Sequence, residues 1–194
     1  MEKNEVWNSL EIMKLVIGAV TPMLIAFFGL YLNKKLKKLE QIQWRNQKLI
    51  EKRLTIYDDL APLLNDLYCY FNFIGNWKEV APSDVVNMKR IIDKKVYLAA
   101  PLFSRPFFTE CMVFINLCYE TKFGMGQNAK LRTRFLGEKG RQRVFAGNWD
   151  NAWNDLFSTE SEISNSEDIR VSYYKIRDIF SDEIGLNPYP PRVL

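Results

Sequence analysis

The strongest hydrophobic signal lies near the N-terminus, where residues 15–32 read LVIGAVTPMLIAFFGLYL without a charge. As a helix this segment is ~27 Å long, close to the ~30 Å thickness of the hydrocarbon core of a bilayer. Lysines follow it instead of the small-residue cleavage site that ends a signal peptide. A buried core helix of this length and composition would be unusual in so small a chain. The sequence therefore predicts one transmembrane helix over residues 15–32, preceded by a short extracytoplasmic N-terminus, residues 1–14.

The glycine and proline residues within this segment predict more than a membrane anchor. Small residues allow two helices to approach closely, and a proline allows a kink. We therefore expect the segment to associate with copies of itself. The residues expected to line a resulting pore are Gly18, Thr21, Pro22, Ile25 and Gly29. Such a pore would be mainly apolar and could gate by dewetting.

Helical periodicity continues beyond the apolar segment, and residues 33–62 are predicted to form a basic stalk helix. Apolar residues recur every seven positions, at Ile42, Leu49, Ile56 and Leu63. The companion positions hold Leu39, Leu60 and Leu67, but also the polar Asn46 and Arg53. This broken heptad fits a stalk that bundles with its copies. It fits equally well a long amphipathic helix that packs on its own domain.

The rest of the chain, residues 63–194, is expected to be a helical domain. The first helix is predicted to run on to about Gly75. Further helices are predicted over residues 84–100, with Ser83 as N-cap, 106–123, 128–145, 149–157 and 166–184, with Ser166 as cap and Gly185 as stop. No convincing alternating strand pattern appears. The predicted fold is all-α: a single N-terminal transmembrane helix that continues into a stalk and a compact helical domain, assembled as a homo-oligomer.

Charge distribution predicts the orientation of the chain. The net charge of +4 is small, but two lysines precede the apolar segment and eight basic residues follow it within about twenty positions. The positive-inside rule therefore places the C-terminal bulk in the cytoplasm and the short N-terminus outside. Three cysteines without CxxC spacing suit a reducing compartment. The lysines next to the membrane segment are expected to contact anionic lipid headgroups.

Composition also limits the chemistry that is open to this chain. It contains no histidine, which excludes Ser–His and Cys–His nucleophile pairs and histidine-ligated zinc. No phosphate-binding glycine loop, HExxH or GxSxG motif is present. We therefore predict no enzyme, no cofactor and no metal. The carboxylates open to a metal-dependent nuclease, the least favoured alternative, include Asp58, Asp59, Asp66 and Asp93.

One segment combines basic and aromatic residues as a nucleic-acid or nucleotide site would. Guanidinium groups bind phosphates and aromatic faces stack on bases. The candidate residues are Lys130, Arg132, Arg134, Phe135, Lys139, Arg141, Arg143, Trp149 and Trp153. The alternative is a solvated basic surface that is neutralised within the chain by acids such as Glu160 and Glu162, which follow shortly afterwards.

Taken together, residues 15–32 as a membrane helix and residues 130–153 as a ligand site resemble the small membrane effectors of bacterial anti-phage defence. Within that group the chain is most similar to the Hailong effectors. The resemblance is one of architecture over the whole chain, without a diagnostic motif. It implies an oligomeric ion channel in the cell inner membrane, whose cytoplasmic domain holds a single-stranded DNA signal that keeps the channel closed. A partner nucleotidyltransferase would make that DNA.

Two functions therefore lead. The first is a homo-oligomeric ion channel of anti-phage defence, gated by a nucleic-acid or nucleotide ligand. The second is a single-pass membrane adaptor whose helical domain binds a protein. The partners expected for the first are the chain itself, membrane lipid, single-stranded DNA or a nucleotide, and a nucleotidyltransferase encoded alongside.

Overall fold

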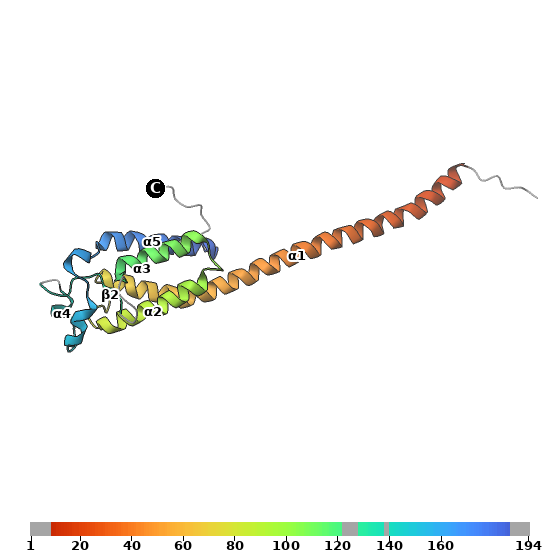
Figure 1. Cartoon of the computed structure of the whole chain (residues 1–194). Helices are drawn as coiled ribbons and strands as arrows, with labels where there is room; N and C mark the ends of the chain where they lie inside the picture. The colour runs from red at the N-terminus through yellow and green to blue at the C-terminus, as the bar shows by residue number, and fades with distance from the viewer. Residues whose placement is uncertain (1–8, 122–127, 138–139, 187–194) are drawn as a thin grey trace, which may run out of the picture. The chain divides into compact units, whose positions relative to one another are not determined.

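A computed structural model describes residues 9–121, 128–137 and 140–186 (Figure 1). The first element, α1, is a 63-residue helix, Ser9–Phe71. By contacts the chain divides after Lys48 into two units, each of which is described by itself. The remaining elements are α2 (Pro82–Ala99), α3 (Arg105–Cys118), β1 (Tyr119–Glu120), β2 (Lys130–Leu131), α4 (Arg141–Val144), η1 (Asn151–Leu156), η2 (Glu160–Glu162) and α5 (Ser166–Glu183). The prediction of a mostly helical chain with a long apolar N-terminal helix is confirmed.

The first unit contains the N-terminal part of α1, with the expected membrane segment inside it. The most apolar 18-residue window of α1 has a mean hydropathy of 2.2, and none of it is buried. By length and composition this helix could cross a membrane. The helix continues through Pro22, and the Thr21 hydroxyl donates a hydrogen bond to the carbonyl oxygen of Ile17 over 2.7 Å.

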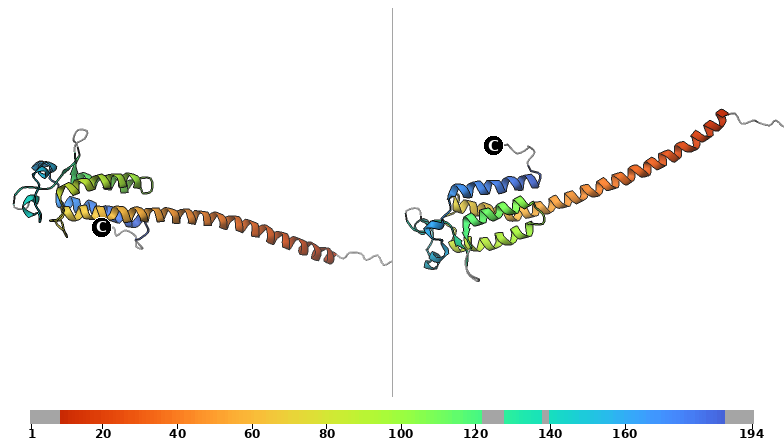
Figure 2. Two further views of the ribbon diagram at one scale, coloured as in Figure 1. Left: turned by 90° about the horizontal axis from the view of Figure 1, so that it is seen from below. Right: turned by 45° about the horizontal axis from the view of Figure 1, so that its top comes forward.

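In the second unit, the last turns of α1 pack with α2, α3 and α5 around one apolar core (Figures 1 and 2). α1 contributes Leu60, Leu64 and Leu67, which are at most 1% exposed. Across from them, the Phe107 ring of α3 lies 4.4 Å from the Phe180 ring of α5. Large apolar side chains from helices that are distant in the sequence therefore meet in one core.

The C-terminal part of the broken heptad packs on the chain's own domain, and the N-terminal part is exposed in the single chain. Leu60 and Leu67 are buried within the chain, whereas Leu39 and Ile42 are about half exposed (57% and 46%). Arg53 lies near the boundary between these two parts, and its side chain forms hydrogen bonds within the second unit. Its Nε donates to the Leu102 carbonyl and its Nη1 to the Glu183 carbonyl, each over 2.7 Å. The C-terminal part of the predicted stalk therefore belongs to the domain, which begins at Leu49 in the structure.

The helix predicted over residues 128–145 is wrong. In its place β2 pairs antiparallel with β1, with Tyr119 opposite Leu131, and α4 spans only four residues. The strict all-α prediction is corrected by this small ribbon. Leu131 is fully buried and also forms a bridge to Phe157. These pairings join segments that are far apart in the sequence, so the local pattern did not reveal them.

Several helix ends also differ from the predictions. α1 ends at Phe71 and not near Gly75, and the chain then turns through Phe73, whose φ of 60° is left-handed. α2 begins at Pro82 behind Ala81, so Ser83 is not its cap. α5 is capped by Asn165, whose side chain accepts from the Glu167 N–H. The expected stop at Gly185 follows α5, with a φ of 76°.

Replacement of Leu64 by alanine tests the assigned core. Leu64 is 1% exposed, so the truncation leaves a cavity and should lower the free energy of unfolding by about 2–5 kcal/mol. Ile91→Ala is the matched control, since Ile91 is 48% exposed, and should change it by less than about 0.5 kcal/mol. Both are measured by denaturant unfolding of the full chain in detergent, and equal effects would contradict this core.

Candidate functional site

The aromatic residues of the candidate ligand segment pack on one another. We call Phe135, Phe145, Trp149, Trp153 and Phe157 the aromatic cluster. The rings of Trp149 and Trp153 lie 5.4 Å apart, and those of Phe135 and Phe157 lie 5.3 Å apart. These side chains therefore form a small apolar core for a segment with little regular structure, and their faces are largely used within the chain.

The backbone beside the aromatic cluster is folded back tightly. A Cβ on Gly140 would lie 2.4 Å from the carbonyl oxygen of Phe135, so a glycine is required there. The N–H of Arg141 then donates to the Arg134 carbonyl over 3.1 Å. This close return therefore brings the backbone of residues 134–135 against that of residues 140–141.

Arg132 is held within the chain. Its Nε donates to the Glu162 carbonyl and its Nη2 to the Glu162 carboxylate, each over 2.7 Å, while its Nη1 donates to the Asn116 carbonyl over 2.9 Å. All three nitrogens are thus engaged, and the side chain ties β2 to α3 and η2. The intramolecular neutralisation that the following acids suggested is found at this residue.

Arg141 is buried, with 3% of its surface exposed. Its Nη2 donates to the Tyr70 carbonyl, in the last turn of α1, over 2.6 Å. The guanidinium carbon lies 4.1 Å from the ring centre of Tyr70, 4.4 Å from that of Phe73 and 5.1 Å from that of Trp77. Burial lowers the pKa of this guanidinium to about 10, so it is charged at neutral pH. A phosphate ligand has no access to it, and Arg141 is removed from the predicted ligand surface.

The contact between Arg141 and Phe73 also explains an unusual backbone. A non-glycine residue in the left-handed region costs about 1–2 kcal/mol. Phe73 adopts it with a φ of 60°, and its ring then lies over the guanidinium and 5.0 Å from the Trp77 ring. Cation–π contacts of a desolvated guanidinium contribute about 2 kcal/mol, enough to offset that strain.

The other basic residues are distributed differently. Arg134 is exposed, and its Nε lies 3.9 Å from the Glu160 carboxylate, a long and solvated pair. Arg143 is exposed on α4, and Lys130 is half-buried in β2. Lys139 lies outside the described residues. Of the nine predicted site residues, Arg134 and Arg143 are the clearly exposed cations, and the structure does not bring all nine onto one surface.

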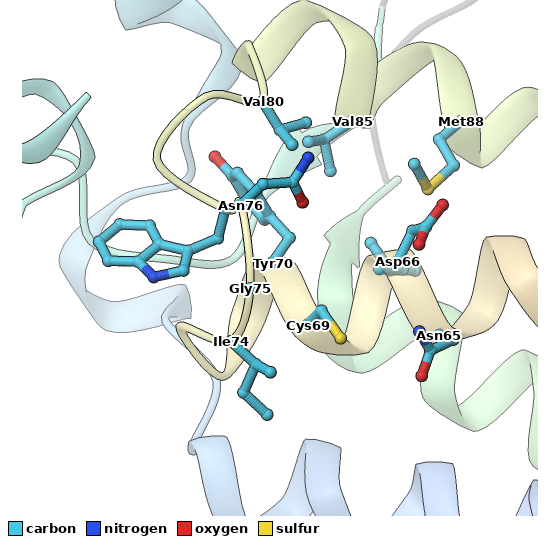
Figure 3. A pocket seen from close by; sticks show the side chains of 12 residues that line it. Asn65, Asp66, Cys69, Tyr70, Ile74, Gly75, Asn76, Val80, Val85 and Met88 are labelled. Carbon is cyan, nitrogen blue, oxygen red and sulfur yellow. The ribbon is translucent and has the colours of Figure 1, made fainter. Parts of the chain in front are cut away.

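A pocket that the sequence did not predict lies beside the end of α1. It has a volume of about 270 Å³. Figure 3 shows Val80, Val85 and Met88 along one side and Asn65, Asp66 and Cys69 along the other. Its residues come from three segments with ordinary core patterns, so no sequence signal marked it.

The carboxylates and thiols do not form a reactive group in the part of the chain that the structure describes. Asp59 pairs with Lys95 over 2.7 Å, and Asp93 pairs with Lys89. Among residues 9–121, 128–137 and 140–186, no set of three acidic or cysteine side chains could hold a metal ion. Burial raises the pKa of the Cys118 thiol well above its usual value, which keeps it protonated and unreactive.

Removal of the Arg132 guanidinium tests its structural role. Arg132→Gln should lower the free energy of unfolding by about 1–3 kcal/mol, because two backbone carbonyls and a carboxylate lose their donor. Arg134→Gln removes the same charge from a longer, exposed pair and should change it by less than about 1 kcal/mol. Thermal unfolding of both variants in one detergent gives the comparison; the reverse order would refute the assignment.

Comparison with known proteins adds no relative to these observations. The chain matches no protein-family model, and no curated protein or solved structure is similar to it.

Proposed function

We propose that this chain is a homo-oligomeric membrane effector, in which copies of α1 form a pore and the C-terminal domain receives a polyanionic signal. The observation that carries the proposal is an exposed apolar face on the part of α1 that follows the membrane segment. We call Leu36, Leu39, Ile42, Leu49 and Ile50 the stalk stripe. Each of them is exposed in the single chain, from 37% for Leu49 to 57% for Leu39.

Helical geometry supports the view that the stalk stripe is a contact surface. At about 100° per residue its five side chains fall within one side of the helix. The opposite side carries polar residues, namely Lys37, Gln41, Arg45, Lys48 and Lys52. An apolar face of this length outside the lipid is normally covered by a partner. A second copy would supply an identical stripe, and the heptad spacing of Ile42 and Leu49 supports such a pairing.

By the same helical geometry, the proposed pore residues lie on one side of the membrane segment. Gly18, Thr21, Pro22, Ile25 and Gly29 fall within about 100° of one another. A Cβ on Gly18 or Gly29 would meet no atom within 4 Å, so contacts in the single chain do not require glycine at either position. Close approach of neighbouring helices in the membrane would require a small residue at both positions.

The proposed ligand contacts are the exposed arginines. Arg134 and Arg143 offer guanidinium groups that can bind phosphate oxygens, with Lys130 nearby in sequence. Because the aromatic cluster covers its own ring faces, phosphate contacts and not base stacking would supply the binding energy. A single-stranded DNA or a nucleotide, produced by a nucleotidyltransferase encoded alongside, has this chemistry. In the proposed assembly such a ligand would bias the pore by its different affinity for the open and closed states.

Polar substitution in the stalk stripe tests the assembly. Leu39→Gln combined with Ile42→Gln should reduce the particle mass in detergent and abolish conductance in a planar bilayer, because the stripe loses its central apolar contacts. Trp44→Gln is the matched control: Trp44 is also exposed and apolar (61%), but it points to the other side of α1. A wild-type chain that is monomeric and passes no ions would overturn the channel proposal.

Charge reversal at the exposed arginines tests the ligand site. We expect the purified wild-type protein to carry a nuclease-sensitive ligand that absorbs at 260 nm. The variant with Arg134→Glu and Arg143→Glu should be purified without this ligand. Arg170→Glu combined with Arg177→Glu makes the same change on α5, where both side chains are exposed, and should leave the ligand bound. Equal ligand content in the two variants would exclude Arg134 and Arg143 as the site.

One observation favours the second function, a membrane adaptor. α2 exposes Ile91, Tyr97 and Leu98, by 48%, 62% and 59%. A protein partner could cover this face, and in that case the chain would anchor the partner at the membrane without passing ions.

A further inference from the structure

The pocket beside the end of α1 is formed by three segments of the second unit. Its volume of about 270 Å³ leaves room for a molecule of roughly ten non-hydrogen atoms. α1 and the residues that follow it supply one part of the lining, and Val85 and Met88 of α2 supply another. We call Val80, Val85 and Met88 the apolar wall, which Figure 3 shows along one side of the pocket. A ligand of this site therefore has an apolar body.

The charge of the lining limits which ligands fit. Asp66 is the one charged residue among the 12 described residues that line the pocket. Among residues 9–121, 128–137 and 140–186, no lysine or arginine forms an ion pair with it. Burial and the nearby Asp66 carboxylate raise the pKa of the Cys69 thiol, so this thiol stays neutral. The lining therefore offers a countercharge to a cation and none to a phosphate or a carboxylate.

A second polar group lies apart from this carboxylate. Figure 3 shows Asp66 beside the Met88 end of the apolar wall and Asn76 beside its other end. With the residues that the structure describes, the Asn76 amide forms no side-chain hydrogen bond, whereas the Asn65 carbonyl oxygen accepts one from the Tyr173 hydroxyl over 3.1 Å. A ligand that reaches both ends of the wall needs a cation at one end and a hydrogen-bonding group at the other.

We propose that this pocket binds a small organic monocation, namely a primary alkylamine with a hydroxyl or similar polar group at its far end. The ammonium group donates to the Asp66 carboxylate, the alkyl chain contacts the apolar wall, and the polar end bonds to the Asn76 amide. A single carboxylate compensates one positive charge, so a monoamine fits better than a polyamine. This site is separate from the proposed polyanion contacts at Arg134 and Arg143 and does not depend on the proposed function.

Calorimetric titration of the full-length protein in detergent tests the charge selectivity. The probes are 5-amino-1-pentanol, the neutral 1,5-pentanediol and the anionic 5-hydroxypentanoate, which share one chain length. The amine should bind saturably, the diol roughly tenfold more weakly and the anion not at all, because only the amine forms a charge-assisted hydrogen bond with Asp66. Titration into protein-free micelles corrects for partitioning. No saturable heat with the amine, or equal binding of the diol, would overturn the proposal.

Variants locate the two ends of the ligand. Asp66→Asn should lower the affinity for 5-amino-1-pentanol roughly tenfold. Asp58→Asn is the matched control: Asp58 is also exposed, lies about two turns earlier on α1 and does not line the pocket, so it should leave the affinity unchanged. Both carboxylates are exposed, so neither variant loses a core contact. An unchanged affinity in Asp66→Asn, or an equal loss in both variants, would refute the site.

Asn76→Ala tests the polar end. This variant should weaken the binding of 5-amino-1-pentanol about three- to tenfold and leave that of n-pentylamine, which lacks the hydroxyl, unchanged. An equal loss for the two amines, or no loss for either, would overturn the assignment of Asn76.

Discussion

The second unit depends on the C-terminal part of α1, whose apolar face forms one side of the core. Leu60, Leu64 and Leu67 of α1 are at most 1% exposed. These positions are three or four residues apart, so they lie on one face of the helix. That face is used up by contacts within the unit, and the rest of the helix surface is left for solvent or for a partner.

The C-terminal end of α1 is stabilised by a side chain from a later part of the domain. The last turn of α1 contains no basic residue, although cations stabilise the carbonyl end of a helix. Arg141 supplies the missing cation from a distant part of the sequence and donates to the Tyr70 carbonyl. The rings of Tyr70, Phe73 and Trp77 stabilise this buried charge, and the left-handed turn at Phe73 brings one of these rings over the guanidinium. The turn therefore has its unusual backbone because of a contact that the local sequence does not contain.

This dependence also explains which features the sequence predicted. Long periodic segments such as α1 and α5 were visible, because their apolar spacing is local and strong. Two members of the candidate ligand segment, Arg132 and Arg141, look like surface charges in the sequence, but β2 and α4 bring them against Glu162 and Tyr70. A run of arginines has the same composition whether it faces solvent or binds carbonyls within the chain. The membrane orientation, the oligomer and the ligand stay predictions, and the pocket beside Asp66 had no local signature at all.

The stalk stripe also bears on whether association needs the membrane. Full burial of a Leu or Ile side chain contributes about 1.5–3 kcal/mol. The five residues are already about half covered by their own helix, so contact with a second copy would contribute roughly 4–8 kcal/mol. Association in solution costs about 4–15 kcal/mol in lost translational and rotational freedom. The stripe alone would therefore give a marginal complex in water. Confinement of the apolar N-terminal segment in a bilayer lowers that entropic cost, which makes self-association of the stalk most favourable in a chain that spans the membrane.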